Sequence, residues 1–294
     1  MEHKTLRVFL IINPGSGNNN TYWSEVINDY FAKLDHVVEL FELPKDPKIQ
    51  IIKDKMMNFK PDRVVAVGGD GTVKLAAECL LKSPVPLSIM PAGSANGLAK
   101  ELGIPEKPEA ALDLALTDHS MSIHVTKVNG ELCIHLSDIG FNAYVIKTFE
   151  SQNGRGMWGY IKASFKVLLR TPKMTVEMDI NNSWEKMECA MIVIANATRY
   201  GSGALINPDG RLDDKVFEVV IVKKVSFREL FKMRFSHALY DPAKTEVFHT
   251  KSLKMFSRRR AHFQVDGEYL GRVNKVEASL IPAALNIIVP ATKD

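Results

Sequence analysis

An aspartate in the middle of a glycine-rich loop is the first feature of this sequence that suggests chemistry. The loop follows an apolar run, Val64–Val67, and a helix-like apolar pattern resumes at Val73. A strand, a tight turn and a helix start form an arrangement that binds phosphate groups. The loop residues are Gly68, Gly69, Asp70, Gly71 and Thr72. The carboxylate of Asp70 would repel a bare phosphate, so the loop needs a further explanation.

A magnesium ion would reconcile Asp70 with a phosphate ligand. A carboxylate is tolerated beside a triphosphate when Mg²⁺, or a water molecule held by it, lies between them. We therefore predict that Asp70 orients the ion and the phosphates, while the glycine N–H groups and the helix terminus supply positive potential. The alternative is a turn aspartate that caps its own backbone.

Two further loops follow strand-like runs in the same half of the chain. One is Pro91–Asn96, in which Ser94 offers a hydroxyl donor. The other consists of Asn13, Pro14, Gly15, Ser16 and Gly17. The carboxyl ends of parallel strands share one edge, so we expect all three loops to meet there. Neither G-x-x-x-x-G-K-[ST] nor a G-x-G-x-x-G after a strand occurs, which argues against a P-loop protein and an ordinary dinucleotide binder.

A second acidic pair, Asp266 and Glu268, lies in "VDGEYLG". Gly267 permits a bend that would present both carboxylates at one turn. From the residues alone, an ordinary hairpin turn is the favoured interpretation, because Asp-Gly is a common hairpin pair.

The elements that must position these residues divide the chain into two parts. Up to residue 122, apolar strand-like runs alternate with helix-like segments, which predicts an α/β domain with a mostly parallel sheet. Residues 123–284 contain many short strand-like runs and an Asn129-Gly130 hairpin signal, so we expect an antiparallel all-β sandwich or barrel. Two helical segments, Gly154–Arg170 and Phe227–Ala238, interrupt it. The final residues, 285–294, are expected to return to the first domain.

Composition adds limits rather than a function. The chain has 294 residues, 46% of them apolar, and a net charge of +4 that by itself favours no partner. Its three cysteines are widely spaced and its eight histidines show no zinc-site spacing. We expect a cytoplasmic protein without a transmembrane segment, a secretory signal or a nucleic-acid partner.

The motifs in order resemble the diacylglycerol kinase catalytic domain family, which includes bacterial lipid kinases and sphingosine kinases. The resemblance rests on "INPGSG", "VGGDGTV", "PAGSANGLAKELGIP", "SDIGFNA", "NPDGRLDDKVFEVVIV" and "VDGEYLG". It implies a nucleotide-binding domain like that of phosphofructokinase and NAD kinase, followed by a β-sandwich that holds the lipid substrate. It also implies ATP between the domains, touching Asn13–Gly17, Gly68–Thr72 and Ser94.

The same resemblance assigns roles to the acids. Glu268 is implied as the proton acceptor and Asp266 as its partner through magnesium, although the order of the two remains open. The segment "RLDDKVF" resembles the family's magnesium-binding loop, which implies Asp214 and the carbonyl groups of Arg211 and Val216 as ligands. Lys215 stands where glycine is common, and "FELPKDPK" lacks a threonine often found there, so occupancy of the ion site and one ATP contact stay open.

The implied function is an ATP- and Mg²⁺-dependent lipid kinase acting on a diacylglycerol-like alcohol. A kinase of a hydrophobic alcohol must meet its substrate at a membrane, so we expect peripheral contact through three basic clusters, although a solvated face over a packed core is the favoured interpretation of each cluster taken alone. They are Lys162, Lys166 and Arg170; Lys223, Lys224, Arg228, Lys232 and Arg234; and Arg258–Arg260. An NAD kinase and a nucleotide- or lipid-binding regulator without turnover remain alternatives. The lipid and the oligomeric state, which could be a homodimer, stay open.

Overall fold

The computed structural model of the chain describes residues 5–17, 22–151, 156–168, 173–180, 183–199, 205–226 and 241–291. The chain divides into two compact units, Met1–Ile123 with Ala283–Asp294, and His124–Pro282. The predicted helix Phe227–Ala238 lies outside the described residues. Within the described part of the chain, no helix combines the length and the apolar character needed to cross a bilayer.

The first unit alternates strands and helices as the sequence predicts. Its strands are β1 (Arg7–Ile12), β2 (Val37–Glu42), β3 (Arg63–Gly68) and β4 (Leu87–Pro91). Its helices are α1 (Trp23–Phe31), α2 (Ile49–Phe59), α3 (Asp70–Leu80), α4 (Gly97–Glu101) and α5 (Pro108–Ala115). Helix α3 begins at Asp70, three residues earlier than the apolar pattern indicates, so the acid of the "GGDGT" loop lies in its first turn.

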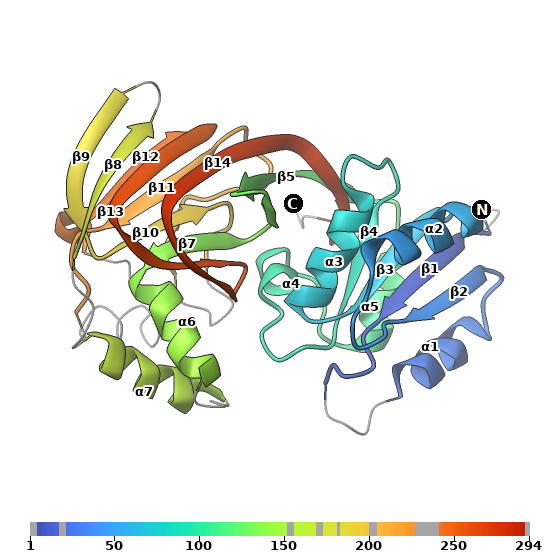
Figure 1. Ribbon diagram of the computed structural model, residues 1–294. Coiled ribbons are helices and arrows are strands. Elements are labelled where there is room, and N and C mark those ends of the chain that lie inside the picture. The colour runs from blue at the N-terminus through green and yellow to red at the C-terminus, as the bar shows by residue number, and fades with distance from the viewer. Residues whose placement is uncertain are drawn as a thin grey trace. The chain divides into compact units, whose positions relative to one another are not determined.

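A parallel sheet in the order β4-β3-β1-β2 forms the middle layer of this unit (Figure 1). Helices α1 and α5 pack on one face, where Ile27 and Leu112 contact alternate residues of β1 such as Leu10. The ring of Phe9, on the opposite face, lies 5.9 Å from that of Phe59 in α2. The last strand of the chain joins this sheet, where Ile287 pairs with Leu87. Both faces of the sheet are therefore covered, which explains its continuous apolar strands.

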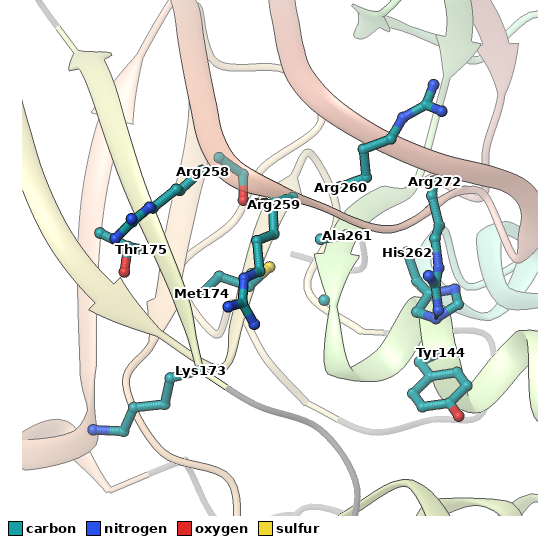
Figure 2. Close-up of a pocket in the computed structure, with 12 residues that line it drawn as sticks. Tyr144, Lys173, Met174, Thr175, Arg258, Arg259, Arg260, Ala261, His262 and Arg272 are labelled. Carbon is teal, nitrogen blue, oxygen red and sulfur yellow. Dashed lines mark hydrogen bonds between the residues drawn. The ribbon is translucent and has the colours of Figure 1, made fainter.

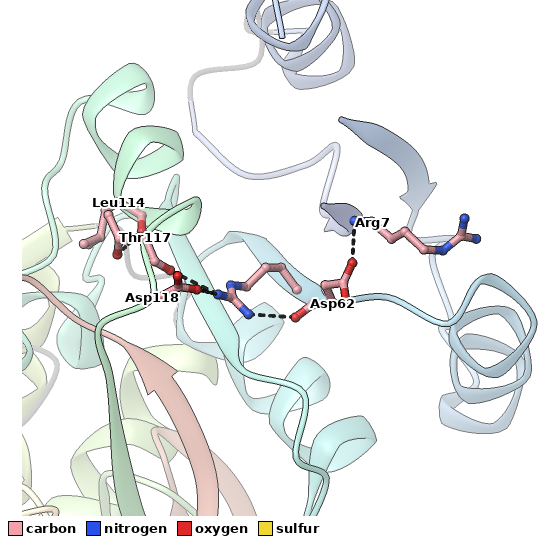
Figure 3. A network of polar contacts seen from close by, with 6 residues as sticks. Arg7, Asp62, Leu114, Thr117 and Asp118 are labelled. Carbon is pink, nitrogen blue, oxygen red and sulfur yellow. Dashed lines mark hydrogen bonds and ion pairs between the residues drawn. The ribbon is translucent and has the colours of Figure 1, made fainter. Parts of the chain in front are cut away.

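Polar contacts fasten the amino ends of β1 and β3 (Figure 3). The backbone N–H of Arg7 donates to the carboxylate of Asp62 at 2.8 Å, and the N–H of Asp62 donates to the carbonyl of Arg7 at 2.8 Å. The neighbouring Arg63 forms an ion pair with Asp118, after α5, and donates to the carbonyl of Thr117 at 3.3 Å. These contacts lie at the sheet edge opposite the glycine loops, so they leave the carboxyl edge available for a ligand.

The second unit is mostly antiparallel sheet. Its strands are β5 (Ser120–Val128), β6 (Glu131–Cys133), β7 (Leu136–Gly140), β8 (Met174–Ile180), β9 (Ser183–Cys189), β10 (Met191–Ala195), β11 (Phe217–Val222), β12 (Thr245–Thr250), β13 (Ser252–Val265) and β14 (Glu268–Ile288). Its helices are α6 (Phe141–Ser151), α7 (Gly156–Leu168) and a short 3₁₀ turn, η1 (Pro242–Lys244). The predicted hairpin joins β5 and β6, with positive φ at both Asn129 and Gly130. Helix α6 was not expected from the residue pattern.

Two layers of strands enclose the main core of this unit. Strands β7, β10 and β11 contribute residues such as Ile192 and Phe217, and the facing layer contributes residues such as Val176 of β8 and Met255 of β13. Helices α6 and α7 cover the other face of β10 and β11, where Val145 and Val167 meet Val193. The predicted sandwich is thus present, with a helical pair on one side.

One strand passes from one layer of the sandwich to the other. The amino-terminal part of β13 pairs with β8, and its last residues, Phe263–Val265, pair with β7. Between these parts the register with β14 shifts, because four residues, Ser257–Arg260, separate two pairs that a single β14 residue, Asn274, separates on the partner strand. Such bulges turn the corners of sandwiches. The many short strand-like runs expected in this part are joined here into two long strands. Strand β13 contains both "SLKMF" and "AHFQV", and β14 contains "KVEASLI" and extends to Ile288, within the run "LNIIVP".

Candidate active site

The three glycine-containing loops of the first unit lie in contact with one another. The backbone N–H of Asn13 donates to the carbonyl of Val67 at 3.0 Å, which anchors the first loop beside the end of β3. A β-carbon added to Gly93 would lie 2.5 Å from Cα of Gly69, and one added to Gly17 would lie 3.4 Å from the carbonyl of Ala92. The residues Asn13–Gly17, Gly68–Thr72 and Pro91–Asn96 therefore share the carboxyl edge of the sheet.

Asp70 connects two of these loops through its carboxylate. One oxygen accepts a hydrogen bond from the backbone N–H of Gly97 at 3.0 Å, and the other accepts one from Leu98 at 3.1 Å. Asp70 therefore caps α4 rather than its own turn, which excludes the own-backbone cap considered above. Each carboxylate oxygen has a second lone pair that these bonds do not use, so the group can also contact an ion.

The start of α3 offers unpaired donors beside open space. Within the described part of the chain, the backbone N–H groups of Asp70 and Gly71 have no hydrogen-bond partner. A β-carbon added to Gly71 would meet nothing within 4 Å, although glycine in a helix costs about 1 kcal/mol relative to alanine. Packing does not explain this glycine, whereas close approach of an anion to the two N–H groups does. The residues present therefore fit a phosphate group.

The hydroxyl groups near these loops differ in their availability. Ser94 is exposed, whereas Ser16 and Thr72 are buried. The hydroxyl of Ser16 donates to the carbonyl of Asn13 at 2.7 Å, so it stabilises its own loop. Of the hydroxyl groups of Ser16, Thr72 and Ser94, that of the predicted donor Ser94 is the one on the surface.

In the second unit, the D-G-E segment forms the tight turn between β13 and β14. Asp266 has a φ of 50°, and its carboxylate accepts hydrogen bonds from the backbone N–H groups of Ile134, His135 and Leu136 at 2.9–3.1 Å. Glu268 is exposed at the first position of β14, where it pairs with Val265. The two acids are adjacent but unlike, because Asp266 is tied to the backbone and Glu268 reaches solvent.

A network of buried polar side chains, which was not expected from the residue pattern, supports this turn. Asp138 accepts from the N–H of Ala143 at 2.8 Å and from the side chain of Asn142 at 2.6 Å, which caps α6. Gln264 donates to Asp138 at 2.6 Å and accepts from the N–H of Gly267 at 2.7 Å. The start of α6 is therefore linked to the D-G-E turn. The sequence signal that could have indicated this network is "SDIGFNA", which contains Asp138 and Asn142 but was not assigned a role from its residues.

The predicted magnesium loop precedes β11. Asp214 accepts a hydrogen bond from the N–H of Val216 at 3.3 Å. The guanidinium of Arg211 binds Asp213 through two contacts of 3.0 Å and holds the pKa of that carboxyl below its usual range. Burial raises the pKa of Glu218 nearby, and the charge of Asp214 adds to this shift, while a hydrogen bond from Asn207 opposes it.

The carboxylates of Asp214 and Glu218 therefore lie near each other at the base of this loop. The described residues contain no group of three or more His, Cys, Asp or Glu side chains arranged to hold a metal ion. The implied site, one carboxylate with two backbone carbonyls, is of a different kind. It stays a prediction for Asp214, Arg211 and Val216.

Comparisons with known proteins agree with this division of the chain. The diacylglycerol kinase catalytic domain profile matches residues 7–128. The profile of the YegS C-terminal NAD kinase beta sandwich-like domain matches residues 138–289. The two matches coincide with the α/β part and the sandwich part described above.

Individual relatives match along almost the whole chain at low identity. A diacylglycerol kinase of Staphylococcus haemolyticus is 23% identical, with 97% of this chain and 88% of that protein covered. An uncharacterized protein of Synechocystis sp. is 26% identical, with 98% and 71% covered. A crystal structure of a diacylglycerol kinase from Bacillus anthracis superposes with a TM-score of 0.72 at 19% identity, covering 98% of each chain. By its ordered motifs, its two-part fold and these matches, the chain belongs to the diacylglycerol kinase catalytic domain family, with a YegS-type sandwich as its C-terminal part.

Proposed function

We propose that this protein is an ATP- and Mg²⁺-dependent lipid kinase that transfers the γ-phosphate to the hydroxyl of a diacylglycerol-like lipid. Membership of a kinase family supports phosphoryl transfer to an alcohol. The observation that carries the nucleotide part is the pair of backbone N–H groups of Asp70 and Gly71, which have no partner among the described residues, beside a glycine whose added β-carbon would meet nothing within 4 Å. These donors suit the phosphate of a nucleotide.

The residues of the first unit bind and orient the nucleotide in this proposal. ATP with Mg²⁺ supplies, when bound, the transferred phosphoryl group and neutralisation of its charge. The N–H groups of Asp70 and Gly71 hold phosphate oxygens, and Ser94 adds a hydroxyl. Asn13–Gly17 and Gly68–Thr72 let the backbone come close to the ligand. Asp70 fixes α4 and contacts the ion through its remaining lone pairs.

The acids of the second unit prepare the lipid hydroxyl. We assign proton acceptance to Glu268, because its side chain is exposed and so can reach the hydroxyl of a substrate. Asp266 acts as a positioning residue, since three backbone N–H groups already occupy its carboxylate. This distribution supports Glu268, rather than Asp266, as the proton acceptor in the proposal. Because the substrate resides in a bilayer, the protein meets it by peripheral contact with the membrane surface.

A lipid panel in mixed micelles tests the proposal. The purified protein is given ATP, MgCl₂ and separate diacylglycerol, monoacylglycerol, ceramide and sphingosine micelles, and phosphorylated lipid is measured by mass spectrometry. We expect transfer to diacylglycerol by the wild type and a loss of at least about 100-fold in Glu268→Ala, the usual scale for a general base. Equal product from the wild type and Glu268→Ala with every lipid would refute the proposal.

The same protein preparation distinguishes the two alternative functions, an NAD kinase and a binding regulator without turnover. The C-terminal part matches a sandwich domain described as NAD kinase-like, so NADP formation from NAD and ATP is measured in parallel without micelles. NADP formation without lipid product would favour a soluble nucleotide kinase. Saturable ATP binding with no product in either assay would favour a regulator that has lost turnover.

A further inference from the structure

The second unit contains a cavity that the proposed phosphoryl transfer does not use. Its volume is about 490 Å³, within the range of about 300–1,000 Å³ that is typical of ligand sites. The bulge of β13, the start of β8, α6 and β14 line it (Figure 2). Six of its lining residues matter for the argument: Tyr144, Lys173, Arg258, Arg259, His262 and Arg272.

The charge of this cavity is of one sign. Lys173, Arg258, Arg259 and Arg272 all carry positive charges and have exposed side chains. Among the residues that the structure describes, no acidic side chain lines the cavity, and none of these four cations forms an ion pair. Like charges that line one cavity repel one another, and an anionic ligand would relieve this repulsion.

The β13 bulge explains how two neighbouring arginines reach the same cavity. Successive residues of a regular strand point to opposite faces, so Arg258 and Arg259 would be separated by the sheet. The register shift at Ser257–Arg260 removes this alternation. The buried hydroxyl of Ser257 donates to the carbonyl of Arg259 at 2.7 Å and so stabilises the bulge. In Figure 2, Arg258 and Arg259 extend from the bulge towards the side of Thr175 and Met174.

Arg272 is held in place at the other end of the cavity. Its Nε and one terminal nitrogen donate to Nε2 of His262 at 3.3 and 3.1 Å, and the ring of His262 stacks on Tyr144 with centroids 4.2 Å apart (Figure 2). Because a guanidinium has donors only, His262 must accept at Nε2 and is neutral, with Nδ1–H directed to the hydroxyl of Tyr269 at 2.7 Å. Burial first, then the charges of Arg272 and Lys147, lower the pKa of His262 to about 4, which agrees with this protonation state.

The fixed guanidinium keeps donors for a ligand. Two of its five N–H groups bind His262, and within the described residues the other three have no partner. Arginine forks match the geometry of phosphate oxygens and bind them through paired hydrogen bonds. The same cavity is thus lined by Arg272, whose guanidinium is held in place, by Arg258 and Arg259 on the bulge, and by Lys173.

We propose that this cavity is a binding site for a phosphate ester, separate from the phosphoryl-transfer residues. The ligand chemistry is a phosphate group, carried either by the headgroup of an anionic phospholipid or by a small phosphorylated molecule in solution. Arg258 and Arg259, with the charge of Lys173, bind phosphate oxygens at one end of the cavity, and Arg272 offers its remaining donors to the ligand from the other end. Among the described residues that line this cavity are none of those assigned to phosphoryl transfer, neither Glu268 nor Asp266 nor Asp70, so the site is distinct from the assigned base.

Paired double variants test the site by binding rather than by turnover. Arg258→Gln/Arg259→Gln removes two charges from the cavity, and Lys251→Gln/Lys254→Gln removes two from a neighbouring part of the same segment that does not line it. Binding is measured with inorganic pyrophosphate by titration calorimetry. It is also measured by co-sedimentation with phosphatidylglycerol vesicles and with phosphatidylcholine vesicles. We expect at least a tenfold loss for the arginine pair and less than a twofold change for the lysine pair.

The pyrophosphate titration and the vesicle co-sedimentation together distinguish the source of the phosphate group. A loss confined to phosphatidylglycerol vesicles supports a headgroup, and a loss confined to pyrophosphate supports a soluble phosphorylated molecule. Equal losses in both double variants, or no loss in either, would overturn the proposal, because general electrostatic attraction would then account for binding.

A charge-conserving variant tests the geometry and guards against misfolding. Arg258→Lys/Arg259→Lys keeps both charges but removes the paired donors. We expect it to melt like the wild type and to lose at least threefold in binding to the probe that the wild type prefers. Wild-type binding by this variant would show that charge alone suffices and would overturn a shaped site.

Discussion

The side chain of Gln264 donates a hydrogen bond of 2.6 Å to the carboxylate of Asp138, although 126 residues separate them along the chain. Both side chains are almost completely buried, at 1% exposure. The same glutamine accepts from the N–H of Gly267, so the beginning of α6 and the D-G-E turn are fastened through one residue. A buried network of this kind specifies one geometry, because each unpaired member would be costly.

We predict that Gln264→Leu, which conserves approximate volume, will destabilise the fold and lower turnover. The substitution leaves Asp138 short of one donor and the N–H of Gly267 without its acceptor, at a cost of about 1–3 kcal/mol per unsatisfied buried group. Urea denaturation measures the free energy of unfolding, and the lipid assay measures turnover. Conserved stability in this variant would mean that the D-G-E turn does not depend on Gln264.

Substitutions of Asp266 and Glu268 should differ in their effect on the free energy of unfolding, although both should lower turnover. Asp266→Asn replaces one of two accepting oxygens by an N–H₂ group that faces backbone donors, so we expect a loss of about 1–3 kcal/mol together with lower turnover. Glu268→Gln changes an exposed side chain and should leave stability within about 0.5 kcal/mol while removing turnover. Thermal melting and the lipid assay are compared for both. The reverse pattern, with a stable Asp266→Asn and an unstable Glu268→Gln, would exchange the roles assigned here.

Two glycines of the first unit offer a matched pair. A β-carbon at Gly71 meets nothing, so Gly71→Ala should keep or raise stability by up to about 1 kcal/mol, yet weaken ATP binding by obstructing the N–H groups of α3. Gly93→Ala places its β-carbon 2.5 Å from Gly69 and should destabilise by about 1–3 kcal/mol. Melting curves and ATP titrations are recorded for both. Unchanged ATP affinity in Gly71→Ala would remove the main support for a phosphate at this helix.

The buried carboxyl group of Glu218 gives a prediction about pH. Because its pKa is raised in the folded protein, the unfolded chain ionises first as the pH rises, and the free energy of unfolding falls as the pH passes from the ordinary glutamate pKa through the raised one. Glu218→Gln carries no such proton. Its melting temperature relative to the wild type should therefore be higher at pH 8 than at pH 4.

Divalent ions must be absent from this measurement. EDTA is included, since a cation beside Asp214 and Glu218 would favour the ionised form and reverse the sign. A difference in melting temperature that does not change between pH 4 and pH 8 would show that Glu218 does not titrate with a raised pKa. Repeating the wild-type series with MgCl₂ then tests the predicted ion site at Asp214, which should raise the melting temperature.

Local patterns in the sequence determined much of the first unit. Continuous apolar runs such as Val64–Val67, followed by glycine turns, predicted the parallel strands and their loops, and the Asn129-Gly130 pair predicted a hairpin that the structure contains. These predictions succeed because they depend on residues within a few positions of one another. Helix α6 was missed, and the runs of β13 and β14 were divided, since a bulged strand that changes layers reads locally as two short strands.

Only the tertiary structure decided what the acids contact. Asp70 caps a helix that begins 27 residues later, and Asp266 accepts from N–H groups about 130 residues earlier. The neutral state of His262 likewise follows from Arg272 on a neighbouring strand. The sequence identifies carboxylates and arginines as residue types, but their hydrogen-bond partners depend on which strands and loops the topology brings together. Short-range spacing carries no information about those partners, because the contacts form across the sheet rather than along the chain.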